Sequence, residues 1–346
     1  MRFRVVIIGA KGMLGQALVR AFSQNNSSHP PLILRGGDRS FPPLNVRGGE
    51  EGLRRGDPPL IIRGGEGELF AWDREECDIT NAALVMKKIG ELQPALIINA
   101  AAYNDVDGAE KDATLANKIN GDAIGYLADA ATKVGATFVH YSTDYVFDGT
   151  KKYGYREDDA PNPISAYGKS KLLGEEKIFL SLRGAHAPEQ SSVRGFTPRN
   201  NFAVYLIRTS RLFGAQGSGK QSFVDAMLER IQKKDTFEIV DEEYACPTYA
   251  EDLAQRTREI IEQKKPSGIY HVTNSAAVTW YGFAQEIFRQ AHELGILTRA
   301  PLVMPVPSSR FPRPAKRPAY SQLLNTKLPP LRSWQEALGD YLSEKV

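Results

Sequence analysis

The sequence predicts an α/β fold: a doubly wound parallel sheet followed by a smaller C-terminal substrate-binding domain. Short apolar runs rich in β-branched residues alternate with stretches whose apolar residues recur at helical spacing, the pattern of a parallel sheet covered on both faces. The first apolar run, "FRVVIIG", ends in a glycine-rich turn. With 346 residues, the chain is long enough for more than one domain.

The strands and helices follow one another in a regular order. After the first strand, Met13, Leu14, Ala17 and Leu18 predict a helix by their spacing. Further strands are expected at 69–73, 94–101, 136–142 and 203–210, with helices at 81–92 and 114–135 and after "APNP". Beyond residue 213 helices are expected at 222–234, 249–263 and 280–294. We therefore assign residues 1–212 to a nucleotide-binding domain and 213–346 mainly to a second domain, with some segments returning to the first.

Two stretches interrupt this order. The pattern PPL–x–x–RGG occurs three times between residues 30 and 65, and residues 181–201 have a similar composition. Pro, Gly, Arg and Glu dominate, and few apolar residues are available to bury. We interpret residues 26–69 and 181–201 as surface insertions, the first lying at the end of the sheet opposite the strand C-termini. The alternative, an Arg-rich anion-binding loop, is weakened by the interspersed acids.

Composition excludes several classes of function. The net charge of +3 is small for this length and gives no indication of nucleic-acid binding. No apolar run approaches the length of a membrane span. The two cysteines, Cys77 and Cys246, lie far apart and form neither a disulfide framework nor a metal-binding spacing. We expect a cytoplasmic protein with no metal, no membrane partner and no nucleic-acid partner.

The turn "GAKGMLG" predicts a dinucleotide site. Gly9, Gly12 and Gly15 stand between the first strand and the first helix, where glycine lets backbone approach a pyrophosphate. An acidic residue at the end of the second strand commonly holds the adenosine ribose. Asp73 fills that position if the repeats are an insertion. Its neighbour Arg74 could hold a 2′-phosphate or be a solvated charge, so the choice between NADH and NADPH stays open.

Tyr167 and Lys171 form a candidate acid–base pair. Residues four apart share one helix face, and a nearby ammonium is expected to lower the pKa of the phenol. The preceding strand runs into Ser142, Thr143 and Asp144, at the edge where open α/β sheets bind ligands. With Thr143 polarising a carbonyl and Tyr167 donating a proton, a hydride donor would complete the reduction of a ketone.

In these motifs the chain resembles the dTDP-4-dehydrorhamnose reductase family, within the extended short-chain dehydrogenases/reductases. The likeness rests on the glycine turn, "NAAAY", "STDYVF", "YGKSK", "RTSRLFG", "EEYACPTY", "GIYHVTN" and "KRPAYSQLLNTKL". It covers nearly the whole chain outside the two insertions. The family implies a Rossmann domain, a sugar-nucleotide domain and an active site in the cleft between them. It also implies reduction of the C4 ketone of dTDP-4-dehydro-β-L-rhamnose with NADPH or NADH.

The resemblance also assigns roles to individual residues. It implies Tyr167 as proton donor, Lys171 on the nicotinamide ribose, and Thr143 and Asp144 on the sugar. It implies a cofactor site made of Gly9, Gly12, Met13, Leu14, Gly15, Asp73, Asp78, Ile79, Ala101, Ala102, Tyr103, Asn104, Tyr167 and Lys171. Oligomeric state is expected to be monomer or homodimer.

The sequence departs from the family at Arg211, where the family often has Trp. Arg211 could meet the substrate diphosphate or form an ordinary surface ion pair. Asp144 is followed by Tyr145 rather than Glu, which favours simple reduction over the dehydration of related enzymes. The alternatives are a reductase or epimerase of another nucleotide sugar, and a non-catalytic relative such as a methionine adenosyltransferase regulatory subunit.

Overall fold

The computed structural model describes residues 3–23, 60–64, 67–183, 203–219, 221–233 and 235–346. Within these residues the main sheet has seven strands in the order β10-β6-β5-β4-β1-β3-β2, of which all but β2 are parallel. The parallel strands are β1 (Phe3–Ile8), β3 (Gly67–Trp72), β4 (Leu96–Asn99), β5 (Thr137–Thr143), β6 (Val204–Thr209) and β10 (Gly268–His271). This confirms the predicted α/β fold with a central parallel sheet.

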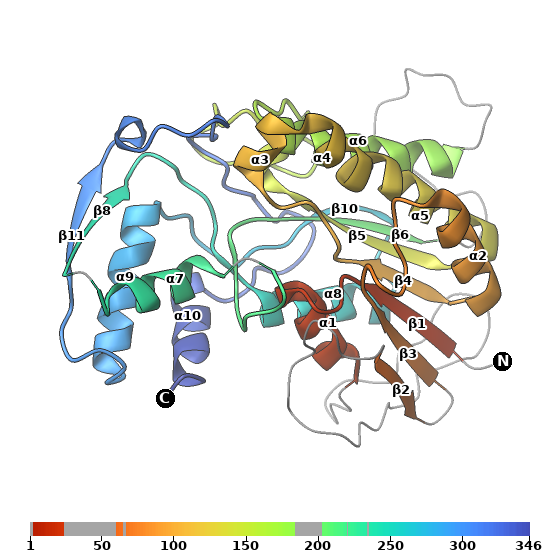
Figure 1. Cartoon of the computed structure of the whole chain (residues 1–346), viewed down its shortest axis with the longest axis horizontal. Helices are drawn as coiled ribbons and strands as arrows, with labels where there is room; N and C mark the ends of the chain where they lie inside the picture. Colours follow the sequence, from red (N-terminus) through yellow and green to blue (C-terminus); the bar gives the residue numbers. More distant parts are fainter. Residues whose placement is uncertain (1–2, 24–59, 65–66, 184–202, 220, 234) are drawn as a thin grey trace.

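Helices cover both faces of this sheet (Figure 1). Alternate residues of β1 show why: Val5 and Ile7 belong to one buried cluster, and Val6 and Ile8 to the other. Since strand side chains alternate between faces, a strand buried on both sides must be apolar throughout. The first cluster packs under α1 (Met13–Ser23) and α8 (Ala250–Glu262), and the second under α2 (Ala82–Leu92), α5 (Ala123–Val134) and α6 (Ala166–Arg183).

The third repeat of the first insertion contributes a strand at the edge of the sheet. Strand β2 (Leu60–Gly64) pairs antiparallel with β3, and Leu60 lies opposite Ala71. Only Gly65 and Glu66 separate β2 from β3 in the sequence, a spacing typical of a hairpin that the repeat had obscured. Because β2 runs antiparallel, it begins near the C-terminal edge of the sheet, so the insertion does not stay at the opposite end. Residues 24–59 and 184–202 lie outside the described residues.

The long helix expected at 114–135 is present at 113–134 and contains a π-helical turn. The chain forms α3 (Val106–Lys111), α4 (Ala113–Asn117), a π-helical turn η1 (Lys118–Asp122) and then α5, which ends at Gly135 in the left-handed conformation. Such π-turns are often found at functional sites. Here the turn carries Asn120, which is fully buried.

The chain beyond β6 builds a third buried cluster and also returns to the sheet. Phe213, Phe283, Phe288 and Trp334 lie in this cluster. Its elements are β7 (Leu212–Phe213), α7 (Phe223–Arg230), β8 (Thr236–Val240), β9 (Thr248–Tyr249), α9 (Trp280–Glu293), β11 (Leu302–Val306) and α10 (Trp334–Ser343). Two short 3₁₀ turns, η2 (Asp144–Val146) and η3 (Ser308–Arg310), complete the structure. Helix α8 and strand β10 rejoin the sheet and its helix layer.

In the part of the chain that the structure describes, no helix is long and apolar enough to cross a membrane. No group of three or more His, Cys, Asp or Glu side chains is arranged to hold a metal ion there. Cys77 and Cys246 are both buried and free.

Candidate functional site

The glycine turn closes tightly over the C-terminal edge of the sheet. Gly9 has a φ of +79°, and a Cβ there would lie 2.6 Å from Ala101 N. A Cβ on Gly15 would lie 2.0 Å from Gly9 O, so α1 packs directly on the turn. Strand β1 is the switch point of the sheet, with β3 on one side and β4 on the other, where ligands bind in such folds. The first residues of α1, Met13 and Leu14, therefore present backbone N–H groups at the expected pyrophosphate position.

A segment of the chain beyond β7, residues 217–218, lies on this turn. Ser218 N donates to Lys11 O over 2.7 Å. A Cβ on Gly217 would lie 2.5 Å from Gly12 C, Lys11 O and Met13 N. The residues after β7 therefore reach the N-terminus of α1, a contact that the sequence reasoning did not predict.

Asp73 stands directly after β3 and is tied to the glycine turn. Its Oδ2 accepts from Lys11 N over 2.9 Å, and burial raises its pKa. Asp78 accepts from Thr80 N and Oγ1, which lowers its pKa, and Ile79 is buried. Arg74 pairs loosely with Asp78 at 3.6 Å and is largely exposed. The structure thus places Asp73 beside the turn and Asp78 and Ile79 on the loop that follows.

The loop after β4 is held by one buried amide. Asn120 Oδ1 accepts from Tyr103 N over 2.8 Å, and its Nδ2 donates to Tyr103 O and to Ser170 Oγ. Ser170 Oγ in turn donates to Tyr167 O. Asn120 therefore joins the predicted cofactor loop, with Ala101, Ala102, Tyr103 and Asn104, to the helix that carries Tyr167. Sequence reasoning missed it because no motif marks a π-turn.

Tyr167 and Lys171 lie in the first turns of α6, as predicted. Lys171 is 3% exposed and its Nζ donates to Tyr141 O over 2.6 Å. Burial lowers the pKa of Lys171 to about 8. The Tyr167 ring meets Tyr145 edge to face, with ring centroids 5.9 Å apart.

The prediction that Lys171 lowers the pKa of Tyr167 is wrong for this structure. Burial raises that pKa, and a hydrogen bond with Thr143 only partly offsets the effect. The physical reason is that the ammonium is directed to a backbone carbonyl of β5 rather than to the phenol. Tyr167 consequently stays protonated near neutral pH, which suits a proton donor.

Asp144 lies in the interior among three hydroxyl groups. Its Oδ1 accepts from Thr143 Oγ1 over 3.0 Å, and its Oδ2 accepts from Ser210 over 2.9 Å and from Ser321 over 2.6 Å. The residue is 3% exposed and burial raises its pKa. Asp144 thus ties Thr143 to two segments far apart in the sequence. Ser210 and Ser321 were not identified from the sequence.

Arg211 does not form a surface ion pair, and that alternative is wrong. Its guanidinium lies 3.9 Å from the centroid of the Trp280 ring. Its Nη1 donates to Val278 O over 2.8 Å and its Nη2 to Glu243 O over 2.6 Å. Its backbone has a φ of +43°, a conformation uncommon for arginine. The packing over Trp280 and the two carbonyls hold the side chain in place.

Further charged residues surround Arg211. The Glu243 carboxylate accepts from Trp280 Nε1 over 3.1 Å and pairs with Arg313. Arg317 makes two hydrogen bonds of 2.8 Å to Asp107 of α3. Arg211 and Arg317 both act electrostatically on Tyr145, the neighbour of Tyr167. The sequence analysis did not identify Glu243, Trp280 or Arg313 as site residues, because each comes from a separate segment.

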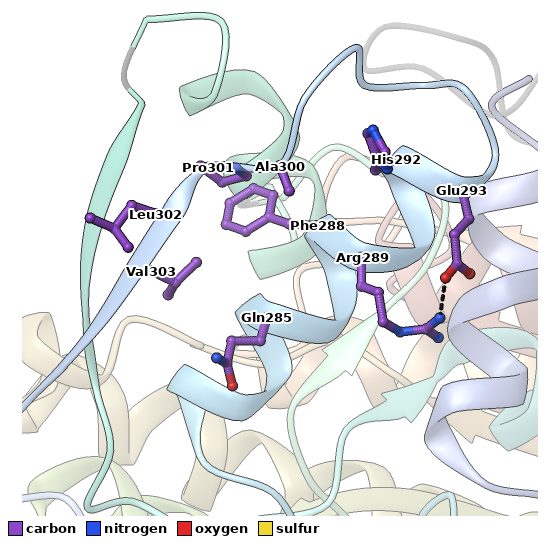
Figure 2. A pocket seen from close by; sticks show the side chains of 9 residues that line it. All are labelled: Gln285, Phe288, Arg289, His292, Glu293, Ala300, Pro301, Leu302 and Val303. Atoms are coloured by element: carbon purple, nitrogen blue, oxygen red, sulfur yellow. Dashed lines mark hydrogen bonds and ion pairs between the residues drawn. The ribbon is translucent and has the colours of Figure 1, made fainter.

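A surface cavity of about 380 Å³ lies elsewhere, between α9 and β11. Figure 2 shows Phe288, Leu302 and Val303 in it, with Arg289 bonded to Glu293 along one side. None of the residues around Tyr167 or Arg211 lines it. The cavity is therefore separate from the candidate site.

A glycine turn after β1 together with a Tyr–Lys pair on the helix after β5 defines a short-chain dehydrogenase/reductase on a Rossmann-type sheet. Comparison with known proteins narrows this class. The family model described as RmlD substrate binding domain matches residues 61–346. The chain belongs to the RmlD family, and the match begins within the third repeat.

Two relatives and one solved structure illustrate the likeness. The dTDP-4-dehydrorhamnose reductase of Burkholderia thailandensis is 35% identical over 79% of this chain and 89% of its own length. A probable dTDP-4,6-dihydroxy-2-methyloxan-3-one 4-ketoreductase of Streptomyces antibioticus is 32% identical over 97% of this chain and 94% of its own. The crystal structure of the Bacillus anthracis dTDP-4-dehydrorhamnose reductase in complex with NADP is 29% identical, covers 99% of this chain and 100% of its own, and superposes with a TM-score of 0.75.

Proposed function

We propose that this protein reduces the C4 ketone of dTDP-4-dehydro-β-L-rhamnose to dTDP-L-rhamnose, with NADPH or NADH as reductant. The observation that carries the proposal is the grouping of Thr143, Tyr167 and Lys171 at the C-terminal edge of β5 in a member of the RmlD family. The relative from Burkholderia thailandensis bears the name of this activity. The Bacillus anthracis structure contains NADP.

The residues of the glycine turn fit a dinucleotide. A Cβ on Gly9 or Gly15 would collide with neighbouring backbone, so glycine allows the tight turn that a dinucleotide site needs. Met13 and Leu14 would hold the pyrophosphate, and Asp73, Asp78 and Ile79 the adenosine half. A bound nicotinamide cofactor supplies the hydride. Ala101, Ala102, Tyr103 and Asn104 would line the cofactor.

Tyr167 donates the proton to the sugar oxygen as the carbonyl is reduced. Its raised pKa keeps the phenol protonated until an alkoxide, which is far more basic, develops beside it. Thr143 orients the carbonyl, and Asp144 fixes the Thr143 hydroxyl. Lys171 binds the nicotinamide ribose. Arg211, stacked on Trp280, helps to bind the sugar nucleotide.

A second candidate is reduction of a different dTDP-4-keto sugar. The near-complete coverage by the Streptomyces antibioticus relative, a probable 4-ketoreductase of another dTDP sugar, favours it. Arg211 also stands where the rhamnose-forming family often has Trp. Both candidate functions reduce a C4 ketone by the same chemistry. They differ only in the sugar that the proposed substrate domain accepts.

We further propose that residues 1–212 form the cofactor domain and 213–346 mainly the substrate domain. The separate buried cluster around Phe213 and Phe283 supports this division. The protein is proposed to act in the cytoplasm as a monomer or homodimer.

The test is turnover. Purified protein is mixed with enzymatically prepared dTDP-4-dehydro-β-L-rhamnose, and oxidation of NADPH and of NADH is followed by absorbance. The expected result is substrate-dependent oxidation with dTDP-L-rhamnose as product. A panel of other dTDP-4-keto sugars separates the second candidate. Absence of oxidation with every substrate would indicate a non-catalytic relative.

A further inference from the structure

A fully buried ion pair lies one helical turn beyond Lys171. Arg208 of β6 bonds through Nε and Nη2 to both carboxylate oxygens of Glu175, over 3.0 and 2.6 Å. The two side chains are 1% and 2% exposed. Arg208 also packs over the Phe147 ring at 5.1 Å. Charges are rarely buried this deeply, because the cost of removing them from water is high even for a pair.

Lys171 is itself buried and depends on its surroundings to stay charged. Residues 171 and 175 are four apart and share one face of α6. Burial favours the neutral amine, and the Glu175 carboxylate is the charge that opposes this. The pairing with Arg208 holds the Glu175 carboxylate in place, on the helix face that also carries Lys171.

The other titratable groups on the elements packed around Lys171 offer no equivalent negative charge. From β5 these are His140, held neutral because burial lowers its pKa, and Tyr141, whose pKa burial raises. Tyr167 on α6 is a neutral phenol, and the Asp144 carboxyl is directed to the hydroxyl groups of Thr143, Ser210 and Ser321. On the outer face of the helix, Lys177 pairs with Asp122 at 3.8 Å, where both side chains are well exposed to solvent.

We propose that Glu175, fixed by Arg208, keeps Lys171 protonated and is thereby a positioning residue for cofactor binding. The proposal rests on the proposed role of Lys171 at the nicotinamide ribose. Without the carboxylate, the buried lysine loses its proton at a lower pH. It then presents a neutral amine to the ribose, and affinity for the cofactor falls.

The experiment measures NADH affinity by calorimetry between pH 6.5 and 9.5, without substrate. NADH is chosen because it lacks the 2′-phosphate, which has an ionisation of its own near pH 6. In the wild type, affinity should fall as pH rises through the pKa of Lys171, about 8. In Glu175→Gln the midpoint of this fall should move down by about one pH unit or more, the usual effect of removing a close opposite charge.

Three further variants make the test specific. Glu175→Asp keeps the charge and should restore the midpoint towards the wild-type value. Glu262→Gln removes another poorly exposed partner of an arginine, Arg258 on α8, and should lower Tm without moving the midpoint. If Glu175→Gln does not fold, Glu175→Gln/Arg208→Met replaces the whole pair by neutral side chains and should show the same downward shift.

An unchanged midpoint in a folded variant lacking Glu175 would overturn the proposal and leave the pair a purely structural contact. The same holds if wild-type affinity shows no decline up to pH 9.5. Because the measurement needs no turnover, a shifted midpoint in a protein that reduces no tested sugar would refute the proposed function alone.

Discussion

The residues around Tyr167 and those around Arg211 are assembled in different ways. Thr143, Tyr167 and Lys171 come from one strand and the next helix along the chain, which residues 144–165 connect. The second group draws Arg211, Glu243, Trp280 and Arg313 from four separate segments. A strand followed by a helix adopts the same geometry in every protein with this type of sheet. Residues placed on such a unit therefore recur at the same sequence positions and can be recognised as a motif. The second group has no such unit, and its side chains meet only because distant segments pack together.

This difference predicts where substitutions act. Changes around Tyr167 should affect the chemical step, whereas changes around Arg211 should affect recognition of the sugar nucleotide. The segment after β7 lies on the glycine turn, where changes should affect cofactor binding. Four substitutions test the distinction, in order of decreasing expected effect.

Tyr167→Phe removes the proton donor and should lower kcat by about 10²–10⁴-fold, the usual contribution of general acid catalysis. Cofactor affinity should stay near the wild-type value, because the ring remains. Tyr145→Phe, on the ring that meets Tyr167 edge to face, is the matched control and should retain most activity. Steady-state kinetics with NADPH measure both. A near wild-type rate for Tyr167→Phe would exclude it as the acid.

Gly217→Ala places a methyl group against the backbone of Gly12 and Met13. The backbone there must shift, and overpacking of this kind costs about 1–3 kcal/mol. We expect weaker NADPH binding, measured by fluorescence titration. Gly219→Ala is the matched control, since a Cβ there meets no atom within 4 Å. Equal behaviour of the two variants would show that the segment does not affect the cofactor turn.

Arg211→Lys keeps the positive charge but loses the planar stack on Trp280 and the fork of bonds to two carbonyls. A desolvated cation–π contact is worth about 2 kcal/mol, so kcat/KM for the dTDP-sugar should fall roughly tenfold or more. KM for NADPH should change little. If instead NADPH affinity fell and sugar recognition did not, Arg211 would belong to the cofactor side.

Asp107→Asn should have the smallest effect. The Arg317 guanidinium holds the pKa of Asp107 down at about 2, below the ordinary value of 3.8. A lowered pKa adds stability above about pH 4 that is lost as the pH falls towards 2. Because the side chain is about one third exposed, solvent screening limits this to less than about 1 kcal/mol.

Urea unfolding at pH 7 and at pH 3 measures this contribution. The variant should be slightly less stable than the wild type at pH 7, and the difference should shrink at pH 3. A difference that stays constant over this range would mean that the ion pair adds nothing to the stability.

The comparison also explains which residues could be predicted. The position of Asp73 directly after a strand was predicted despite the long insertion, since a strand ending in an acid follows the first helix in this topology. Asn120 was not, because it acts from a π-turn inside an apparently continuous helical pattern. Strand β2 was not predicted, because its sequence is one of three similar repeats that were interpreted together as an insertion. The alternative of a surface ion pair for Arg211 failed because its side chain packs over Trp280, which lies far along the chain.

The sequence by itself determined the order of strands and helices, the glycine turn, and the spacing that puts Tyr167 and Lys171 on one helix face. These features depend on local periodicity and backbone freedom, which neighbouring residues control. Only the tertiary structure decided how deeply Lys171 and Tyr167 are buried and which charged groups surround them. It buried Lys171 beside Glu175, directed its ammonium to Tyr141 O and raised rather than lowered the pKa of Tyr167. Desolvation depends on every atom that excludes water from a group, and those atoms come from segments that the sequence does not bring together.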